Sequence, residues 1–504
     1  MKKHHQLAGC ALLILCLPAS AKNFDQGVID HAAPLFLNNS MGQNSHWSGI
    51  GTFSAKNTCN ATLIDTRSHQ SDGPAYVLTS GHCFERPYQQ LIATDTDVNV
   101  AISFNNFQDT RQNRSVYTIK RVNWQSLQGT NLAIAELDAP LSRLIANGIH
   151  PLKMGHTPKT AISALLVGAS YTQANALALR SCLLQTSADT LAFPSVWSNA
   201  LTSQCNITTQ SLSGSPMLDR ESNTIIAVLG TVPLRQNAHN RCNESAPCEV
   251  IGGIAQAQQL NTQYSHTLEN LSNCWKNGVL NTDPGYCSLY PATITTLSAP
   301  KPVQHYLPAL PGDKHPAIFP TWDVKFSISA PFYRYKIVDR SEHCQNPADY
   351  SVAFSSSHAH ITAPVGEKAG VSMLCLLGVS SENQGPLWGD LMNVRVLAVN
   401  LEEQGRAWKP AISATGYGFE RPQWTELTLK RDAHFNTRYF VKSGPPASTE
   451  CGSQEGYRPL ADEVFEDDMF KIVRQAQPTQ HCLYSHNIRN DQSAVVSYLM
   501  NKKP

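Results

Sequence analysis

The segment Ser211-Leu212-Ser213-Gly214-Ser215-Pro216 is the part of the chain from which we build the prediction. Small residues on both sides of Ser213 let the backbone turn sharply, so that its hydroxyl stands clear and main-chain N–H groups point toward a carbonyl group under attack. Such a turn predicts a nucleophilic serine. Serine, glycine and proline are also common in ordinary surface turns, so a second signal has to decide between these two interpretations.

That second signal lies far upstream, in Leu78-Thr79-Ser80-Gly81-His82-Cys83. The segment resembles the Leu-Thr-Ala-Ala-His-Cys sequence around the general base of trypsin-like serine peptidases, and the Ser213 segment resembles the nucleophile turn of the same family. The two motifs occur in the family's order. The resemblance covers roughly the first half of the chain. It implies a two-barrel, all-β peptidase domain in which His82 takes a proton from Ser213.

The third catalytic position departs from the family pattern. The family has an aspartate in a segment like Asn-Asp-Ile-Ala-Leu-Leu-Glu-Leu, and here Thr130-Asn131-Leu132-Ala133-Ile134-Ala135-Glu136-Leu137 places Asn131 at that position. An asparagine can hold an imidazole through its carbonyl oxygen but does not stabilise the imidazolium formed during catalysis. Three interpretations stay open: a slow peptidase that uses Asn131, a peptidase that borrows another carboxylate, and an inactive relative whose cleft only binds. The carboxylates available for borrowing include Asp95, Asp97 and Asp138.

The resemblance also implies where the oxyanion hole and the specificity pocket lie. The backbone N–H groups of Ser211 and Ser213 are the expected oxyanion donors. Ile207 stands shortly before the nucleophile, where a preference for Lys or Arg requires an acid, and Val228-Leu229-Gly230-Thr231 is the expected, mostly apolar pocket wall. We therefore predict an uncharged residue on the acyl side of the cleaved bond. Leu212 occupies the place of an aspartate that pairs with a freshly cut N-terminus, so activation by that route is not expected.

The N-terminus has the organisation of a secretory signal peptide. Lys2-Lys3 form a positive region, an apolar run from Ala8 to Leu17 follows, and Pro18-Ala19-Ser20-Ala21 is a small-residue cleavage site. We expect residues 1–21 to be removed and the mature protein to be secreted or periplasmic. No later apolar run is long enough for a transmembrane segment. The full chain has 39 Lys+Arg and 38 Asp+Glu, a net charge of +1, which argues against nucleic acid as a partner.

Cysteine usage agrees with an oxidising compartment. Of the 14 cysteines, two lie in the signal peptide, and the others form an even set that suggests disulfides rather than metal or redox chemistry. We expect no cofactor and no metal ion. Neighbours in the sequence suggest the pairs Cys59–Cys83, Cys182–Cys205, Cys242–Cys248, Cys274–Cys287, Cys344–Cys375 and Cys451–Cys482. The family resemblance implies the first pair, and the connectivity of the others stays open.

The strand pattern predicts an all-β protein. Short apolar runs separated by Gly, Asn, Asp or Pro recur as far as about residue 287, in the rhythm of a barrel or sandwich. Apolar residues from Ile254 to Leu271 fall at helical spacing, which suits a helix that closes the peptidase domain. We expect that domain to span residues 22–289, and a stiff, proline-rich linker to span residues 290–320.

Two similar segments follow the linker. Trp322 to Phe332 aligns with Trp424 to Phe435, and the two later cysteine pairs have the same spacing. Alternating apolar residues predict strands, so we expect two repeated β-sandwich modules at 321–412 and 413–504. Modules behind an exported enzyme commonly anchor or present it, which here suggests contact with a surface or a glycan. The other expected partner is a peptide or protein substrate. The alternative function is a catalytically silent adhesin or binding protein on a peptidase fold.

Overall fold

The computed structural model describes residues 24–67, 73–157, 159–170, 175–207, 210–233, 242–257, 261–271, 273–309, 312, 315–404, 407, 409–417, 423–431, 436–466, 469–473 and 477–500. The predicted signal peptide lies outside these residues. The chain divides into two compact units. Unit 1 comprises Met1–Glu249, Gln256–Thr295 and Leu377–Arg395, and unit 2 comprises Val250–Ala255, Thr296–Leu376 and Val396–Pro504. All the predicted catalytic residues belong to unit 1.

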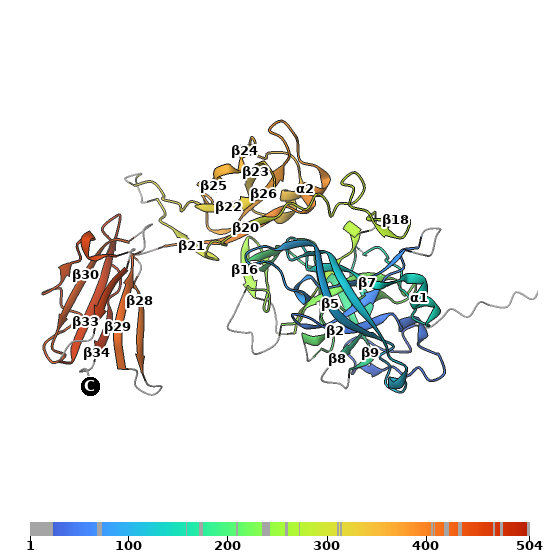
Figure 1. The fold of residues 1–504 in the computed structure, drawn as a ribbon. Helices are drawn as coiled ribbons and strands as arrows, with labels where there is room; N and C mark the ends of the chain where they lie inside the picture. The colour runs from blue at the N-terminus through green and yellow to red at the C-terminus, as the bar shows by residue number, and fades with distance from the viewer. Residues whose placement is uncertain are drawn as a thin grey trace, which may run out of the picture. The chain divides into compact units, whose positions relative to one another are not determined.

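Six strands of unit 1 close into a first barrel, in the order β2-β3-β4-β7-β6-β5 (Figure 1). These strands are β2 (Ile50–Ser54), β3 (Thr58–Leu63), β4 (Pro74–Thr79), β5 (Ile92–Phe104), β6 (Ser115–Ser126) and β7 (Leu132–Pro140). Each strand is antiparallel to its neighbours. The short helix α1 (Leu141–Ala146) follows β7. Closure of the sheet removes its exposed edges.

Six later strands form a second ring, because β8 pairs with β9 as well as with β13. In ring order they are β8 (Ile162–Ser170), β9 (Ala176–Thr186), β12 (Ala200–Ser203), β17 (Gln263–Thr267), β14 (Ile225–Thr231) and β13 (Pro216–Asp219). Strand β1 (Leu35–Phe36) adds to this sheet by pairing with β9. Two closed six-stranded barrels in succession are the architecture of a trypsin-like domain. The predicted fold class is therefore confirmed.

The segment from Ile254 to Leu271 is not a helix, so that prediction is wrong. It contains strand β16 (Ile254–Ala257), strand β17 and the short 3-10 helix η7 (Glu269–Leu271). Strand β17 pairs with β12 on one side and with β14 on the other, and it completes the second barrel. Its residues from Gln263 to His266 are buried. Tertiary pairing therefore overrides the helical spacing of the apolar residues in this segment.

Smaller elements complete unit 1. They are β10 (Thr190–Ala192), β11 (Ser195–Trp197), β15 (Cys248–Ile251), β18 (Trp275–Lys276), β19 (Val279–Leu280), α2 (Trp388–Met392) and the 3-10 helices η1 (Ser45–Trp47), η2 (Gly81–Cys83), η3 (Arg111–Asn113) and η5 (Gln210–Leu212). The elements η2 and η5 matter most for function, because each carries or directly precedes a predicted catalytic residue.

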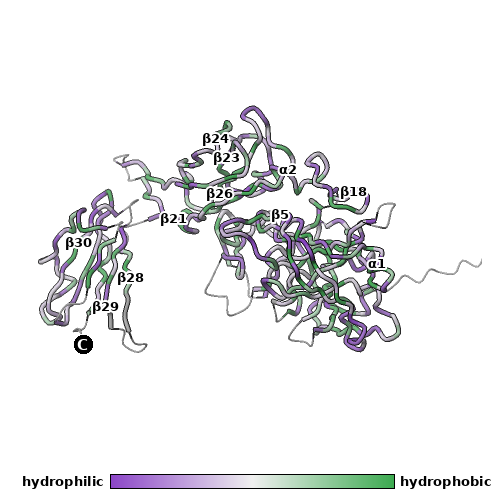
Figure 2. Tube along the Cα trace, in the orientation of Figure 1, coloured by the Kyte–Doolittle hydropathy of each residue, from purple (hydrophilic) through white to green (hydrophobic). Residues whose placement is uncertain are grey.

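Successive residues of the barrel strands face two different cores. In β4, Val77 packs inside the first barrel, whereas Leu78 packs in a core that both barrels share. In β8, Leu166 lies inside the second barrel and Leu165 lies in the shared core. Figure 2 shows such hydrophobic positions along the strands. The two-residue period of a strand thus determines how the barrels pack against each other.

Unit 2 contains two pairs of β-sheets. The first pair consists of β20 (Thr295–Leu297), β22 (Val324–Ile328) and β25 (His360–Ile361), and of β21 (Val303–Tyr306), β27 (Arg395–Glu403), β26 (Gly370–Val379), β23 (Phe332–Val338) and β24 (Phe354–Ser355). The second consists of β28 (Ala411–Tyr417), β29 (Gln423–Lys430) and β32 (Met469–Val473), and of β31 (Arg458–Pro459), β30 (Asn436–Gly444), β33 (Thr479–Asn487) and β34 (Val496–Met500). Both sheets of a pair contribute to one hydrophobic core, so each pair is a β-sandwich. The proline-rich segment expected as a linker contributes β20 and β21 to the first sandwich.

The structure joins the cysteines in the six neighbouring pairs predicted from the sequence. The disulfide Cys59–Cys83 links β3 to the turn that carries His82. Each sandwich of unit 2 holds one disulfide that joins cysteines 31 positions apart.

The two sandwiches share one arrangement of polar groups beside their disulfides. In each, a lysine ammonium donates to backbone carbonyls and lies over a tyrosine ring, and the tyrosine hydroxyl donates to the carbonyl of the first disulfide cysteine. In the first sandwich these residues are Lys336, Asn346, Ala348, Tyr350 and Cys344. In the second they are Lys442, Glu450, Ser453, Glu455, Tyr457 and Cys451.

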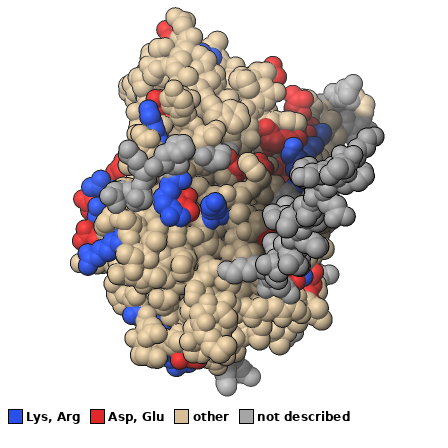
Figure 3. Space-filling model, turned by 90° about the vertical axis from the view of Figure 1, so that its right-hand side faces the viewer, with Lys and Arg blue, Asp and Glu red and all other residues tan. Residues whose placement is uncertain are grey.

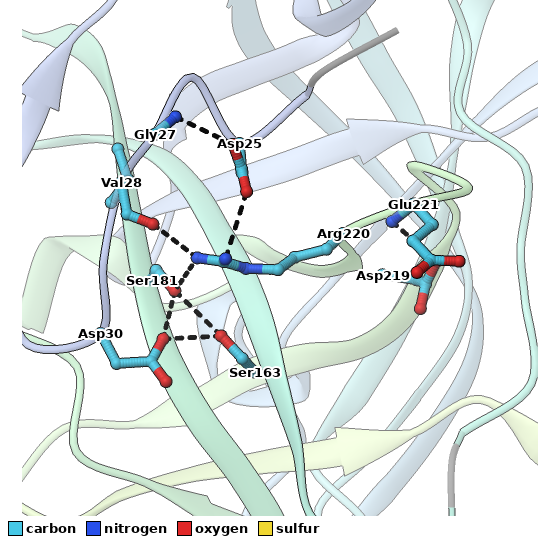
Figure 4. A network of polar contacts seen from close by, with 9 residues as sticks. All are labelled: Asp25, Gly27, Val28, Asp30, Ser163, Ser181, Asp219, Arg220 and Glu221. Atoms are coloured by element: carbon cyan, nitrogen blue, oxygen red, sulfur yellow. Dashed lines mark hydrogen bonds and ion pairs between the residues drawn. The ribbon is translucent and has the colours of Figure 1, made fainter. Parts of the chain in front are cut away.

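The first described segment of the chain is attached to the second barrel by a polar network around Arg220 (Figure 4). The Arg220 guanidinium pairs with Asp25 at 3.2 Å and donates to the Val28 carbonyl at 2.6 Å. It also donates to the hydroxyl of Ser181 at 2.6 Å. Burial alone raises the pKa of Asp30 in this network, but hydroxyl donors, one of them Ser181, outweigh it and hold that pKa below its ordinary value. The network joins β13–β14 to a segment far away in the sequence.

A segment from within the sequence of the first sandwich belongs to unit 1. This segment spans Leu377–Arg395 and contains α2. The Asn393 carbonyl accepts a hydrogen bond from the side chain of Gln128, 265 positions earlier, and the Asn393 side chain donates to the Ser288 carbonyl at 3.3 Å. Gln128 and Asn393 are both buried. The loop that leads to Asn131 is therefore supported by a much later part of the chain.

The surface carries few charges. Figure 3 shows one face on which Lys and Arg side chains are interspersed with Asp and Glu. Among the residues that the structure describes, no helix has the length and apolarity needed to cross a membrane.

Candidate active site

Three turns bring the predicted catalytic residues to one cavity. His82 lies in η2 after β4, Asn131 directly precedes β7, and Ser213 directly follows η5. These three residues and Ser211 line a cavity of about 370 Å³. The other residues that line it are Lys56, Asn57, Thr58, Thr231, Val232, Glu244 and Ser245. Residues of both barrels therefore meet at this site.

The turn at Ser213 is as sharp as the sequence predicts. Gly214 has a φ of +84°, and a Cβ atom at this position would lie 2.0 Å from the Asn60 carbonyl oxygen. Only glycine fits there without displacing backbone. On either side, Leu212 is buried in the core of the second barrel, and the Ser215 N–H donates to the Leu212 carbonyl at 3.0 Å. The nucleophile turn is thus anchored by packing and by its own hydrogen bond.

The expected oxyanion donors lie on and directly after η5. Ser211 is within this 3-10 helix and Ser213 is the next residue after its end. In a 3-10 helix each N–H points toward the carbonyl three residues earlier. The directions of the Ser211 and Ser213 N–H groups therefore depend on how η5 is held. The Asn60 side chain donates to the Ser211 carbonyl at 2.8 Å and is the contact that fixes this carbonyl.

Asn131 contacts His82 in three ways. Its Oδ1 accepts the His82 backbone N–H at 3.1 Å, and Nδ1 of the imidazole lies 3.3 Å from Oδ1 and 3.0 Å from Nδ2. A general base for Ser213 carries its proton on Nδ1 and donates it to Oδ1. An imidazole that instead accepts the amide N–H at Nδ1 carries its proton on Nε2 and cannot take the Ser213 proton. The amide of Asn131 therefore offers Nδ1 both an acceptor and a donor.

The electrostatic surroundings keep the His82 imidazole neutral. Burial lowers the pKa of His82 to about 4, a hydrogen bond from the ring to Asn131 Oδ1 opposes this decrease, and the charges of Arg86 and Lys56 lower the pKa further. In a Ser-His-Asp site a carboxylate raises the imidazole pKa instead. The charged side chains that act on His82 here are both cations, so this base accepts a proton weakly.

The carboxylates considered for borrowing lie elsewhere. Asp95, Asp97 and Asp138 are exposed, and none of them lines the cavity. Asp97 pairs instead with Arg121 at 3.0 Å. The carboxylate that does line the cavity is Glu244, whose pKa is raised by burial. The structure gives no support for a borrowed aspartate among the three named in the sequence.

A second buried histidine, missed in the sequence, lies behind Asn131. His266 on β17 is 1% exposed, its Nε2 has no hydrogen-bond partner among the described residues, and burial lowers its pKa to about 3. A Cβ at Gly230 would lie 2.7 Å from His266 Nε2 and 3.2 Å from Asn131 Nδ2. The missing side chain of Gly230 therefore gives both residues their space. A lone histidine in a strand carries no sequence signal for such a position.

The cavity wall lies farther along β14 than the sequence suggested. Ile207 and Leu229 are buried in the core of the second barrel, and Val228 is buried in the shared core. A β-bulge between Leu229 and Thr231 shifts the pairing of β14 with β17. Of the expected wall, Thr231 lines the cavity, and Val232 lines it as well, while Gly230 lies behind it against His266.

His82, Cys59 and Cys83 are close enough to hold a metal ion, with ligand atoms within 4.8 Å of one another. Both cysteines are joined in a disulfide, however, so neither offers a thiolate. This cluster is a structural support for the His82 turn.

Comparisons with known proteins add solved structures of low similarity. No protein-family model matches the chain, and no curated protein matches its sequence. The chain is similar to a thermostable serine protease AL20 from an extremophilic microorganism, with 14% identity over 44% of this chain and 92% of that chain and a TM-score of 0.28. It is similar to protease Anisep from Arthrobacter nicotinovorans, with 14% identity, coverage of 44% and 91%, and a TM-score of 0.27. For a Glu endopeptidase solved with MPD the identity is 15%, the coverage 41% and 87%, and the TM-score 0.29. The assignment of the fold depends on the two closed barrels described above.

Proposed function

We propose that this chain is an exported serine endopeptidase that cleaves peptide bonds through an acyl-enzyme. The observation that carries the proposal is the meeting of His82, Asn131 and Ser213 at one cavity of a two-barrel fold. Ser213 Oγ attacks the peptide carbonyl carbon, its proton passes to His82 Nε2, and the N–H groups of Ser211 and Ser213 stabilise the oxyanion. His82 then gives the proton to the leaving amine, and water hydrolyses the acyl-enzyme.

Asn131 makes this proposed reaction slow. Nε2 of His82 must be free of its proton before it can accept one from Ser213, but the amide N–H at Nδ1 favours the other tautomer. Oδ1 lies 3.3 Å from Nδ1 and also accepts the His82 backbone N–H, so it supports the productive tautomer only in competition with the amide N–H. Among the residues that the structure describes, no carboxylate bonds to the His82 ring, so the developing imidazolium lacks that stabilisation. In a Ser-His-Asp peptidase the exchange of Asp for Asn lowers turnover by about 10⁴-fold.

The proposed substrate is a peptide or protein with an uncharged residue on the acyl side of the cleaved bond. Thr231 and Val232, which line the cavity beside the nucleophile, carry no charge. They offer a cationic side chain no charged partner, and burial raises the pKa of Glu244, the carboxylate that lines the same cavity, which weakens it as a partner.

We also propose the setting in which the enzyme works. Residues 1–21 act as a cleaved signal peptide, and the mature chain works outside the cell or in the periplasm. The six disulfides are typical of such oxidising compartments. The two sandwiches are repeats of one module that contact a surface or a glycan. The same placement of Lys336 and Lys442 over a tyrosine ring supports their descent from one unit.

Labelling with a fluorophosphonate, which forms a covalent bond only with an activated serine, tests the proposal. We expect the full-length protein to be labelled, peptide mapping to locate the label on Ser213, and His82→Ala to abolish labelling. Ser215→Ala is a matched control in the same turn, because Ser215 is fully buried and does not line the cavity. A folded wild-type protein that stays unlabelled would contradict the enzyme and favour the silent binding protein.

A further inference from the structure

Asn60 is a fully buried residue of β3 whose side chain is completely paired. Its Nδ2 donates to the Ser211 carbonyl at 2.8 Å and to the Ala169 carbonyl at 3.0 Å. Its Oδ1 accepts the Ala169 N–H at 2.9 Å. Asn60 is 0% exposed, so water cannot replace any of these bonds. A side chain of the first barrel thus binds the backbone of the second barrel and of the nucleophile turn.

The backbone of the same residue adds two contacts. The Asn60 N–H donates to the Ser213 carbonyl at 2.8 Å. The Asn60 carbonyl accepts the hydroxyl of Thr79 at 2.6 Å and is the atom that excludes a side chain at position 214. Asn60 therefore holds the carbonyls of both Ser211 and Ser213, the two residues whose N–H groups are the proposed oxyanion donors.

The residues around Asn60 also hold the base. Asn57, at the other end of the same short stretch, donates from Nδ2 to the His82 carbonyl at 2.9 Å. Between them, Cys59 is bonded to Cys83, the residue after His82. Residues 57–60 thus contact the backbone on both sides of the proposed proton transfer.

We propose that Asn60 is the positioning residue that sets the nucleophile turn against the base. This inference rests on the proposed function and adds a residue to it. The chemistry is specific: two carbonyl oxygens and one N–H face the side chain, and an amide supplies two donors and one acceptor. An aspartate at this site turns its second oxygen toward two carbonyl oxygens, and an alanine leaves all three partners unpaired.

The test compares Asn60→Ala and Asn60→Asp in the full-length protein. We expect both variants to react with a fluorophosphonate roughly 100-fold more slowly than wild type, because displacement of a reacting group by about 1 Å costs this much. The KM for a peptide substrate should change little, so the loss appears in kcat. The ratio of the Asn60→Asp rate to the wild-type rate should rise as the pH falls, since a protonated carboxyl again donates to a carbonyl.

Asn106→Ala is the matched control. Asn106 is also 0% exposed in the first barrel, and its Nδ2 donates to the Ser103 carbonyl at 2.7 Å, away from the cavity. This variant should lose stability to a similar degree and keep the wild-type labelling rate. Equal labelling of Asn60→Ala and Asn106→Ala would overturn the inference and leave the proposed function intact.

Hydrogen exchange separates the proposed peptidase function from the proposed role of Asn60 in holding the nucleophile turn. Amide exchange in the peptide that contains residues 211–215 should accelerate in Asn60→Ala but not in Asn106→Ala, and this readout needs no catalysis. An unlabelled wild type with accelerated exchange in Asn60→Ala would end the proposed function and retain Asn60 as the residue that holds the turn. Unchanged exchange would show that Asn60 does not hold it.

Discussion

The nucleophile half and the base half of the candidate site differ in how well their polar groups are paired. At the nucleophile, the side-chain amide of Asn60 donates to the Ser211 carbonyl, and its backbone N–H donates to the Ser213 carbonyl. At the base, the Asn131 amide N–H faces Nδ1 of His82, and His266 Nε2 has no partner among the described residues. In the proposed reaction, the nucleophile half is therefore preorganised for acyl transfer, while the base half limits proton transfer.

The largest expected effect comes from restoring the missing charge. Asn131→Asp keeps an oxygen for the His82 backbone N–H and offers a second oxygen to Nδ1–H. The imidazole then has the productive tautomer and a partner for its charge. We expect kcat/KM to rise by up to about 10⁴-fold, the reverse of the loss seen when an aspartate is removed. Initial rates on a peptide substrate measure this rise in kcat/KM. Asn131→Ala is the control, because it removes the contacts of this side chain with both the backbone N–H and the ring of His82.

An Asn131→Asp variant that is no faster than wild type would break the comparison, because proton transfer would then not be the limiting half. A gain in both Asn131→Asp and Asn131→Ala would show that the amide hinders catalysis without any need for the carboxylate.

The next largest effect is expected at Gly230. In Gly230→Ala the new methyl group would lie 2.7 Å from His266 Nε2 and 3.2 Å from Asn131 Nδ2. Asn131 or His266 must move, so we expect a roughly 100-fold loss of labelling rate at Ser213. The free energy of unfolding should fall by about 1–3 kcal/mol. Gly366→Ala, where the nearest atom is 3.6 Å away, is the control that should leave labelling unchanged.

The pH dependence sharpens the comparison further. Since the pKa of His82 is lowered to about 4, the acid limb of kcat/KM for the wild type should lie near pH 4, with full activity above it. In Asn131→Asp a carboxylate stabilises the imidazolium and raises this pKa, so the limb should move to higher pH. The pH of the acid limb is determined in both proteins from kcat/KM values measured between pH 3.5 and 9, on protein shown to be folded at each pH. An acid limb at the same pH in both proteins would contradict this account of the base half.

The smallest effect is expected outside both halves. Arg220→Ala removes the ion pair with Asp25 and the bond to Val28, both partly buried. We expect the free energy of unfolding to fall by about 1–3 kcal/mol in urea titrations. Labelling of Ser213 should stay near the wild-type rate. Arg340→Ala, which removes an exposed pair with Glu342, should cost at most about 1 kcal/mol. A large loss of labelling in Arg220→Ala would place the N-terminal segment within the catalytic machinery.

The sequence predicts those parts of the site that have local motifs. His82 and Ser213 stand in segments with a recognisable pattern, and Asn131 could be placed by the strand that follows it. Asn60 and His266 have no such pattern. Asn60 meets Ser211 from 151 positions away, and only the closure of both barrels brings them together.

The fold, too, could be predicted from the sequence only where the signal is local. The strand pattern predicts a barrel or a sandwich, because it is a local property, and the arrangement in two barrels was implied by the resemblance of the His82 and Ser213 motifs. The pairing partners of β17 are not local, so the apolar residues after Ile254 were misread as a helix. The bulge in β14 is likewise not local in the sequence, and of the expected wall from Val228 to Thr231 only Thr231 lines the cavity, beside Val232.

The contribution of Leu377–Arg395 to unit 1 has a consequence for biogenesis. During synthesis the nucleophile leaves the ribosome long before Asn393 is available to cover Gln128. The catalytic unit can therefore complete its structure only after most of the chain has been made. If the chain is the proposed peptidase, its activity would then be withheld from a nascent or truncated polypeptide.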